Sequence, residues 1–487
     1  MKEAGVILAA LLAASAVLSR SSRVAAYAAI GALILTPVLL LSEIWDSEQL
    51  RPLRDRPGLA IVLAGLGLAV IGAAVWLMGR RPFVFPVLAM VALPFRIPIA
   101  VAGTTSNLLV PLYLVIAAGT LAWAVPHLRS RGPDEERARS RWLEWALMGF
   151  VVLYAIQSTY SDDFDKALEQ AVFFYVPFAL LYASLREVEW TRRLLGICLG
   201  VLAALAVAFV GVGFWEYHSK ELLLNPKVIN ANQFEAYFRV NSLFFDPNIY
   251  GRFLAIVMLG IAAVVLWTRR PRTAVVGGLL LALLWAGLVL TFSQSSFGGL
   301  LAGLAVLAAL RWSARWTAVA VAAAVAVGAA FVLAAPGAVH LKLGDSSSAN
   351  TATSGRVDLL EGGWELIRDK PLQGWGSASF SRAYRREQHV SSLKAVSASH
   401  TIPVTVAAEQ GAPGLLLYLA LVVLALVALL RGAGRSVARA AVAAAFVALL
   451  VHTMLYAAFL EDPLAWVLLA VGVALARGEP DGEPEPA

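Results

Sequence analysis

The stretch "TIPVTVAAEQGAPGLLLYLALVVLALVALL" (residues 401–430) decides the fold, because it is almost entirely apolar and carries a single charged residue, Glu409. A helix needs about 20 mostly apolar residues to cross a membrane. This run is longer than one span requires. We therefore expect its first turns to lie outside the hydrocarbon, or the helix to be kinked.

Similar runs recur from one end of the chain to the other. Of the 487 residues, 60% are hydrophobic and 15% are charged, and the mean hydropathy is +0.74. Soluble chains average about 45–50% apolar and about 25% charged residues. The predicted fold is all-α: a polytopic transmembrane helix bundle of about 12–15 spans. The run at 82–98 is broken by Pro94 and Pro98.

The net charge of +7 is better explained by topology than by a nucleic-acid partner. Arginines cluster in five short loops between apolar runs, and alternation of the spans puts all five on one side, which the positive-inside rule makes the cytoplasm. These loops contain Arg129–Arg141, Arg186–Arg193, Arg269–Arg272, Arg311–Arg315 and Arg431–Arg439. The only cysteine, Cys198, excludes an intramolecular disulfide and makes a cysteine-based metal site implausible.

Two long loops, 217–246 and 336–400, are expected on the opposite, extracytoplasmic side. In the larger loop, Val357, Leu360, Trp364 and Ile367 recur at helical spacing and predict an amphipathic helix. We expect extra N-terminal transmembrane helices over 1–80, a core over 81–476, and a disordered cytoplasmic tail over 477–487, which is acidic and rich in proline.

Polar residues that could carry chemistry gather near the two long loops. Asp246 and Asn248 flank Pro247, so an ordinary helix cap explains them about as well as a site does. Arg239 could be an interfacial cation, but its forked guanidinium also suits a phosphate. Arg252 is one of the few charged residues inside an apolar run.

The larger loop adds two more candidates. Arg356 stands at the predicted helix start, where exposed N–H groups favour an anion. His400 lies where polar sequence gives way to the apolar run, and a neutral imidazole there can accept a proton from a hydroxyl. Each residue taken singly is better explained by a solvated or interfacial role, and Glu409 could orient a neighbour or simply snorkel.

Taken together, four stretches resemble the O-antigen ligase and Wzy O-antigen polymerase superfamily of membrane glycosyltransferases. They are "FRVNSLFFDPNIYGRFLA" (238–255), "LVLTFSQSSFGGLLAGL" (288–304), "SGRVDLLEGGWELIRDKPLQGWGSASF" (354–380) and "SHTIPVTVAAEQGAPGLLLYL" (399–419). They occur in the family's order, on one predicted side. The sequence departs from the family at Ser293-Gln294, where members often have Ser-Arg, and at His400-Thr401, where His-Asn is common. A third cation is then missing, or is supplied by Arg252, Arg382 or Arg385.

The resemblance implies a membrane enzyme that moves a glycan from undecaprenyl diphosphate to an acceptor hydroxyl outside the bacterial cytoplasmic membrane. It implies that His400 activates the acceptor, that Arg239 and Arg356 bind the diphosphate, and that no metal or other cofactor is needed. Asp246, Asn248, Arg252 and Glu409 are possible supporting residues. The partners are membrane lipid, the lipid-linked donor, and a glycan, lipid or protein acceptor. The residues do not separate a ligase from a polymerase.

Two other functions stay open. A flippase or transporter of the lipid-linked glycan would also need many helices, although it would favour a charged central cavity rather than polar groups at one face. A metal-dependent membrane glycosyltransferase would use paired carboxylates early in the chain, for which Asp46 and Glu48 are available.

Overall fold

The computed structural model describes residues 2–45, 51–101, 104–129, 142–224, 238–334, 356–389, 399, 401–456 and 458–477. Within these ranges, nine helices are long and apolar enough to cross a membrane. The predicted all-α polytopic bundle is confirmed, and the chain is a multi-pass membrane protein.

The helices follow the apolar runs closely. The first half of the chain forms α1 (Lys2–Leu18), α2 (Ser22–Ile44), α3 (Arg51–Asp55), α4 (Pro57–Arg80), α5 (Val84–Ala92), α6 (Val110–His127), α8 (Trp142–Gln157), α9 (Phe164–Gln170), α10 (Val176–Leu185) and α11 (Arg192–Ser219). A π-helical turn, Ala171–Tyr175, joins α9 to α10. The second half forms α13 (Pro247–Trp267), α14 (Pro271–Thr291), α15 (Gln294–Arg311), α16 (Ala314–Ala334), α18 (Arg356–Asp369), α19 (Phe380–Glu387), α20 (Ile402–Leu430), α21 (Val437–Thr453) and α22 (Pro463–Arg477).

One short hairpin interrupts the helical pattern. The apolar run at 82–98 gives only the short helix α5, and the chain then pairs β1 (Ile97–Val101) with β2 (Thr104–Leu108) in an antiparallel register. Pro94 and Pro98 explain the change, because proline cannot donate the backbone hydrogen bond that continues a helix. The sequence did not predict this hairpin.

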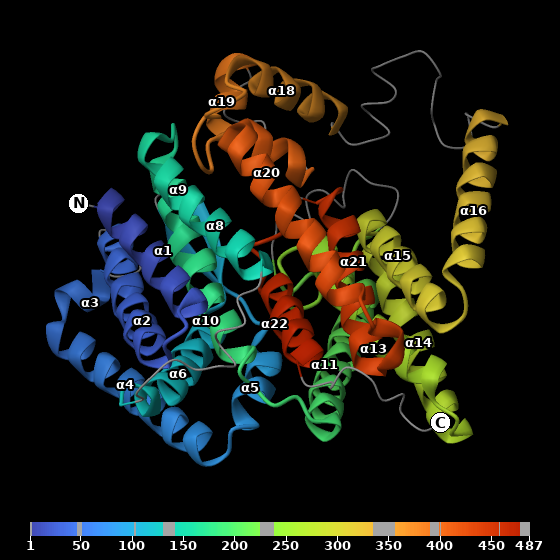
Figure 1. Cartoon of the computed structure of the whole chain (residues 1–487), viewed down its shortest axis with the longest axis horizontal. Helices are drawn as coiled ribbons and strands as arrows, with labels where there is room; N and C mark the ends of the chain where they lie inside the picture. The colour runs from blue at the N-terminus through green and yellow to red at the C-terminus, as the bar shows by residue number, and fades with distance from the viewer. Residues whose placement is uncertain are drawn as a thin grey trace.

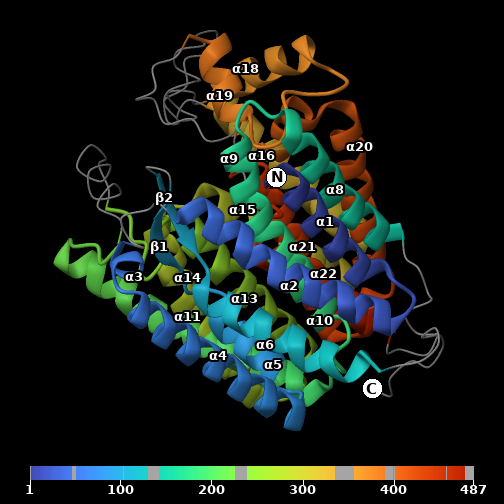
Figure 2. The ribbon, with the colours of Figure 1, turned by 90° about the vertical axis from the view of Figure 1, so that its left-hand side faces the viewer.

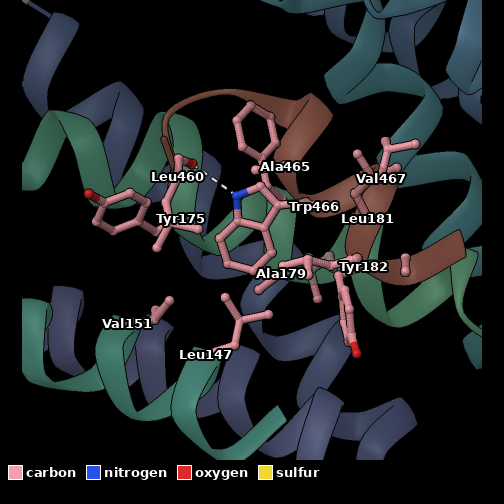
Figure 3. Close-up of a cluster of buried hydrophobic side chains, with 14 of the residues drawn as sticks. Leu147, Val151, Tyr175, Ala179, Leu181, Tyr182, Leu460, Ala465, Trp466 and Val467 are labelled. Carbon is pink, nitrogen blue, oxygen red and sulfur yellow. Dashed lines mark hydrogen bonds between the residues drawn. The ribbon is translucent and has the colours of Figure 1, made fainter. Parts of the chain in front are cut away.

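The core is built where α8, α10 and α22 meet (Figures 1 and 3). Trp466 of α22 is fully buried there, against Leu147 and Val151 of α8 and Ala179 of α10. Its indole N–H donates to the carbonyl of Leu460 at 2.9 Å, so the ring is buried without leaving its polar atom unpaired.

The N-terminal helices share this core. Val6, Ala9 and Ala13 of α1 belong to the same cluster of buried apolar side chains as α8, α10 and α22. Figure 2 shows α1 and α2 lying along α8 and α10. The small alanines allow this close approach, because helices in a membrane associate through tight packing of small residues.

A buried carboxylate draws three chain segments to one end of the bundle. Glu144, at the start of α8, accepts from Arg186 at 3.0 Å, and from Arg477 at 3.4 Å. Arg186 follows α10 and Arg477 ends α22, so these three boundaries lie together. This agrees with the predicted topology, in which alternation of the spans places the arginine-rich loops on one side of the membrane.

At the other end, α18 and α19 pack over the start of α20 (Figure 1). We call this the α18 end. The predicted amphipathic helix is confirmed as α18, but Leu359 and Leu366 are its buried side chains, whereas Leu360 and Trp364 are 38% and 54% exposed. The apolar stripe seen in the sequence therefore only partly coincides with the packed face.

Candidate active site

The predicted kink in the 401–430 run lies at Gly411, whose φ of 62° and ψ of −162° interrupt α20. The interruption leaves helix carbonyls without their usual partners, and the 371–376 loop supplies new ones. The N–H groups of Trp375 and Gly376 donate to the carbonyls of Ala408 and Glu409, at 3.0 and 2.8 Å.

Glycines allow the 371–376 loop to pack closely against the interruption in α20. Both Gly374 and Gly411 have a positive φ, and a Cβ at Gly374 would lie 2.2 Å from the carbonyl oxygen of Glu409. A Cβ at Gly411 would lie 2.3 Å from the carbonyl oxygen of Leu372. Pro371–Gly376 and Glu409–Gly411 belong to two different stretches of those quoted above, and they form the two sides of one contact.

Glu409 completes the contact with its side chain. One carboxylate oxygen accepts from the backbone N–H of Ala378 at 3.0 Å, and the other accepts from Phe380 at 3.1 Å, at the start of α19. The carboxylate is buried. Its position joins the α18–α19 unit to α20.

Arg239 lies at the same end of the bundle, where the first long loop returns to the membrane. Its Nε donates to the carbonyl of Thr291 at 2.9 Å, at the end of α14. Its Nη2 donates to the side-chain oxygen of Asn248 at 3.2 Å. The two bonds fix the plane of the guanidinium between the start of α13 and the end of α14.

Asp246 is the N-cap of α13, as the sequence predicted, and its Oδ1 accepts from the N–H of Asn248 at 2.6 Å. The Tyr456 phenol, in the turn after α21, lies near the Asp246 carboxylate, and burial is the main cause that raises the pKa of this phenol.

Arg252 lies one helical turn after Asn248 in α13 and is 2% exposed. It forms a buried ion pair with Asp462, and its Nη1 donates to the carbonyl of Ala458 at 3.4 Å. Arg382, another possible third cation, pairs with Asp163 at 2.9 Å, and Arg385 also has an interaction partner. Each of these three guanidiniums is thus engaged with other groups of the protein.

The α14–α15 junction adds polar groups that the sequence only hinted at. Ser295, in the first turn of α15, places its Oγ 3.1 Å from Nε2 of His452 in α21. The same His452 nitrogen lies 3.2 Å from the carbonyl oxygen of Asn248. The sequence signal for this cluster was a histidine inside an apolar run, but Ser295 and Asn248, which contact it, are far from it in the sequence. Two further residues were not predicted: Arg96, which follows α5, and Asp462.

His400 lies outside the described residues, and Arg356 is described only as the first residue of α18. The residues on either side of His400 are described. Ser399 Oγ donates to the carbonyl of Thr401 at 2.7 Å, and Thr401 Oγ1 donates to the carbonyl of Met454 at 3.1 Å. Met454 is the C-cap of α21, two residues after His452, so the start of α20 is tied to the turn that also contains Tyr456.

Residues 279–419 match the family model described as O-antigen ligase. The matched segment contains the α14–α15 junction, all of α18 and α19, and the kink of α20. The resemblance is confirmed over this segment, and it supports an O-antigen ligase-like membrane glycosyltransferase. No curated protein matches the chain.

Proposed function

Starting from an O-antigen ligase-like membrane protein, we propose that it transfers a glycan from undecaprenyl diphosphate to an acceptor hydroxyl, with inversion and without a metal. The proposed site lies at the α18 end, on the extracytoplasmic side of the bacterial cytoplasmic membrane. His400 is the proposed base, and Arg239 and Arg356 are the proposed ligands of the diphosphate.

One observation carries the proposal: three hydrogen bonds, joined by short stretches of backbone, link Arg239 to the residue beside His400. Arg239 bonds to Asn248, whose carbonyl lies against His452. The turn after His452 then bonds to Thr401 through Met454. The segment bearing the proposed base and the element bearing the proposed phosphate ligand are therefore held in one framework.

The chemistry requires little else. The acceptor oxygen attacks the anomeric carbon as its proton passes to the His400 imidazole, and the bond from that carbon to the diphosphate oxygen breaks. The guanidiniums stabilise the negative charge that develops on the leaving diphosphate. Attack from the face opposite the leaving group inverts the anomeric centre, and no covalent enzyme intermediate forms.

Asn248 and Asp246 support this site in the proposal by orienting Arg239 and by capping α13. Glu409 supports it by holding α18 and α19 against α20. Arg252 supports it through the pair with Asp462, which holds the start of α22 against α13.

The test uses purified protein and an undecaprenyl diphosphate glycan, with and without a candidate terminal acceptor. Transfer to the terminal acceptor alone indicates a ligase, and a ladder of products without that acceptor indicates a polymerase. Movement of the donor across a vesicle membrane with no transfer product would contradict the proposal in favour of a flippase. Loss of transfer in chelator would contradict the metal-independent mechanism.

A further inference from the structure

Two guanidiniums share one carboxylate at the α18 end. Asp462 forms its buried ion pair with Arg252. The same carboxylate is the group that attracts Arg96 most strongly. With Arg252 already paired, the positive charge of Arg96 is left without a carboxylate of its own among the described residues.

The backbone at Arg96 is anchored, while the Nε of its guanidinium lacks a hydrogen-bond acceptor in the described part of the chain. Phe95, its neighbour, packs edge-to-face on Phe209 with ring centroids 6.0 Å apart. Phe209 also packs on Phe244 and Phe253, so the backbone at Arg96 is anchored in an aromatic cluster. The Arg96 Nε atom is buried, and no described residue accepts its hydrogen bond. Burial is the main effect that lowers the pKa of this guanidinium; Asp462 opposes the effect and Arg252 adds to it.

Arg96 is also close to the element that positions Arg239. It lines a cavity together with Phe244 and Ile249, which flank the N-cap of α13, and with Asp462. The cavity has a volume of about 10 Å³, which is room for about one water molecule. An anionic group that contacts Arg96 would therefore lie at the mouth of the cavity rather than inside it.

A partly buried cation with a shared counter-ion and a buried Nε that lacks an acceptor among the described residues is costly unless something else neutralises it. A membrane protein retains such a residue where it serves a substrate or ion. We propose that Arg96 is a further phosphate-binding residue, which contacts the diphosphate of a polyprenyl diphosphate beside Arg239. The inference rests on the function proposed above, and it assigns a role to the segment between α5 and β1, which lies outside the family match.

The test compares Arg96→Met, which removes the charge and keeps most of the apolar volume, with Arg272→Met as a matched control. Arg272 is exposed and lies at the opposite end of the α13–α14 pair. The probes are a synthetic polyprenyl diphosphate, the corresponding monophosphate and the corresponding polyprenol, each titrated against purified protein in detergent.

Arg96→Met is expected to weaken diphosphate binding by about tenfold or more, the usual effect of losing a hydrogen bond to a charged group. Polyprenol binding should not change. The melting temperature should stay the same or rise, because a partly buried charge without a carboxylate of its own in the described ranges is removed. Arg96→Lys should fall between wild type and Arg96→Met.

Diphosphate binding by Arg96→Met equal to that of wild type would overturn the inference and leave the proposed function standing. A parallel loss of all three probes with a lower melting temperature would also overturn it, because it would show a packing role. A wild-type protein that does not bind the diphosphate would overturn the inference and the proposed function together.

Discussion

The carboxylate of Glu409 accepts a hydrogen bond from the backbone N–H of Phe380 at 3.1 Å, where α19 begins. A residue that reads in the sequence as a lone charge near the membrane surface is thus a buried anchor between two helices. This relationship changes what substitution of Glu409 should do.

Glu409→Ala should destabilise the α18–α19 unit by about 2–3 kcal/mol, because it leaves the N–H groups of Ala378 and Phe380 without an acceptor. Glu409→Gln should restore only part of this loss, since one of its two polar atoms is a donor that faces another donor. Thermal unfolding of the purified variants measures the effect. Glu361→Ala, at an exposed position of α18, is the control and should unfold like wild type. A stable Glu409→Ala protein that lacks only turnover would instead point to direct catalysis.

Gly411→Ala should be strongly destabilising, because the residue has a φ of 62° and a Cβ there would lie 2.3 Å from the carbonyl oxygen of Leu372. Gly278→Ala in α14 is the matched control, since its Cβ would have no neighbour within 4 Å. The control should be neutral or slightly stabilised. Expression level and melting temperature measure both variants, and equal values would show that the 371–376 loop does not need the interruption in α20.

Arg239→Ala should reduce transfer by at least about tenfold, by removing a guanidinium that binds phosphate. Arg239→Lys keeps the charge but loses the fork, so it should recover only part of the activity. Asn248→Ala should have a smaller effect, because it removes one positioning bond of Arg239 and leaves the bond to Thr291. Steady-state transfer assays measure all three, and full activity of Arg239→Ala would remove this residue from the site.

His400→Ala should lower transfer by about a hundredfold or more while donor binding is retained, because a positioned base accelerates the chemical step. Wild-type activity should be highest above the ordinary imidazole pKa of about 6.5 and should fall as pH drops through it, because only the neutral ring accepts a proton. Binding and turnover are measured on the same preparation. If they fell together, His400 would be a binding residue. If neither fell, the base would have to be sought at Asp246 or Glu409.

Cysteine labelling tests the orientation of the chain. In a background without Cys198, a cysteine at Ser347 should react with an impermeant thiol reagent added outside intact cells, whereas one at Ser130 should not. Both positions lie outside the described residues. The reverse pattern would place the α18 end in the cytoplasm and remove the proposed site from the compartment of its substrates.

Local patterns in the sequence determined much of this protein. Apolar runs of about 20 residues specify helices, because a backbone in lipid must satisfy its own hydrogen bonds. The Asp-Pro pair predicted the cap at Asp246, and a kink was one of two explanations for the length of the 401–430 run. The arginine-rich loops predicted which helix ends lie on the same side of the membrane. The hairpin at 97–108 was missed, because its prolines signal only the end of a helix and not the conformation of the next segment.

Tertiary structure decided which side chains meet. Arg252 and Asp462 are far apart in the chain, as are Glu409 and Phe380, and no local pattern indicates that they pair. Gly374 and Gly411 each suggest a turn when taken alone, and only the packed bundle shows that each makes room for the other's backbone. Residues on separate helices come together when the helices pack, and that packing depends on the fit of whole surfaces rather than on any short stretch of sequence.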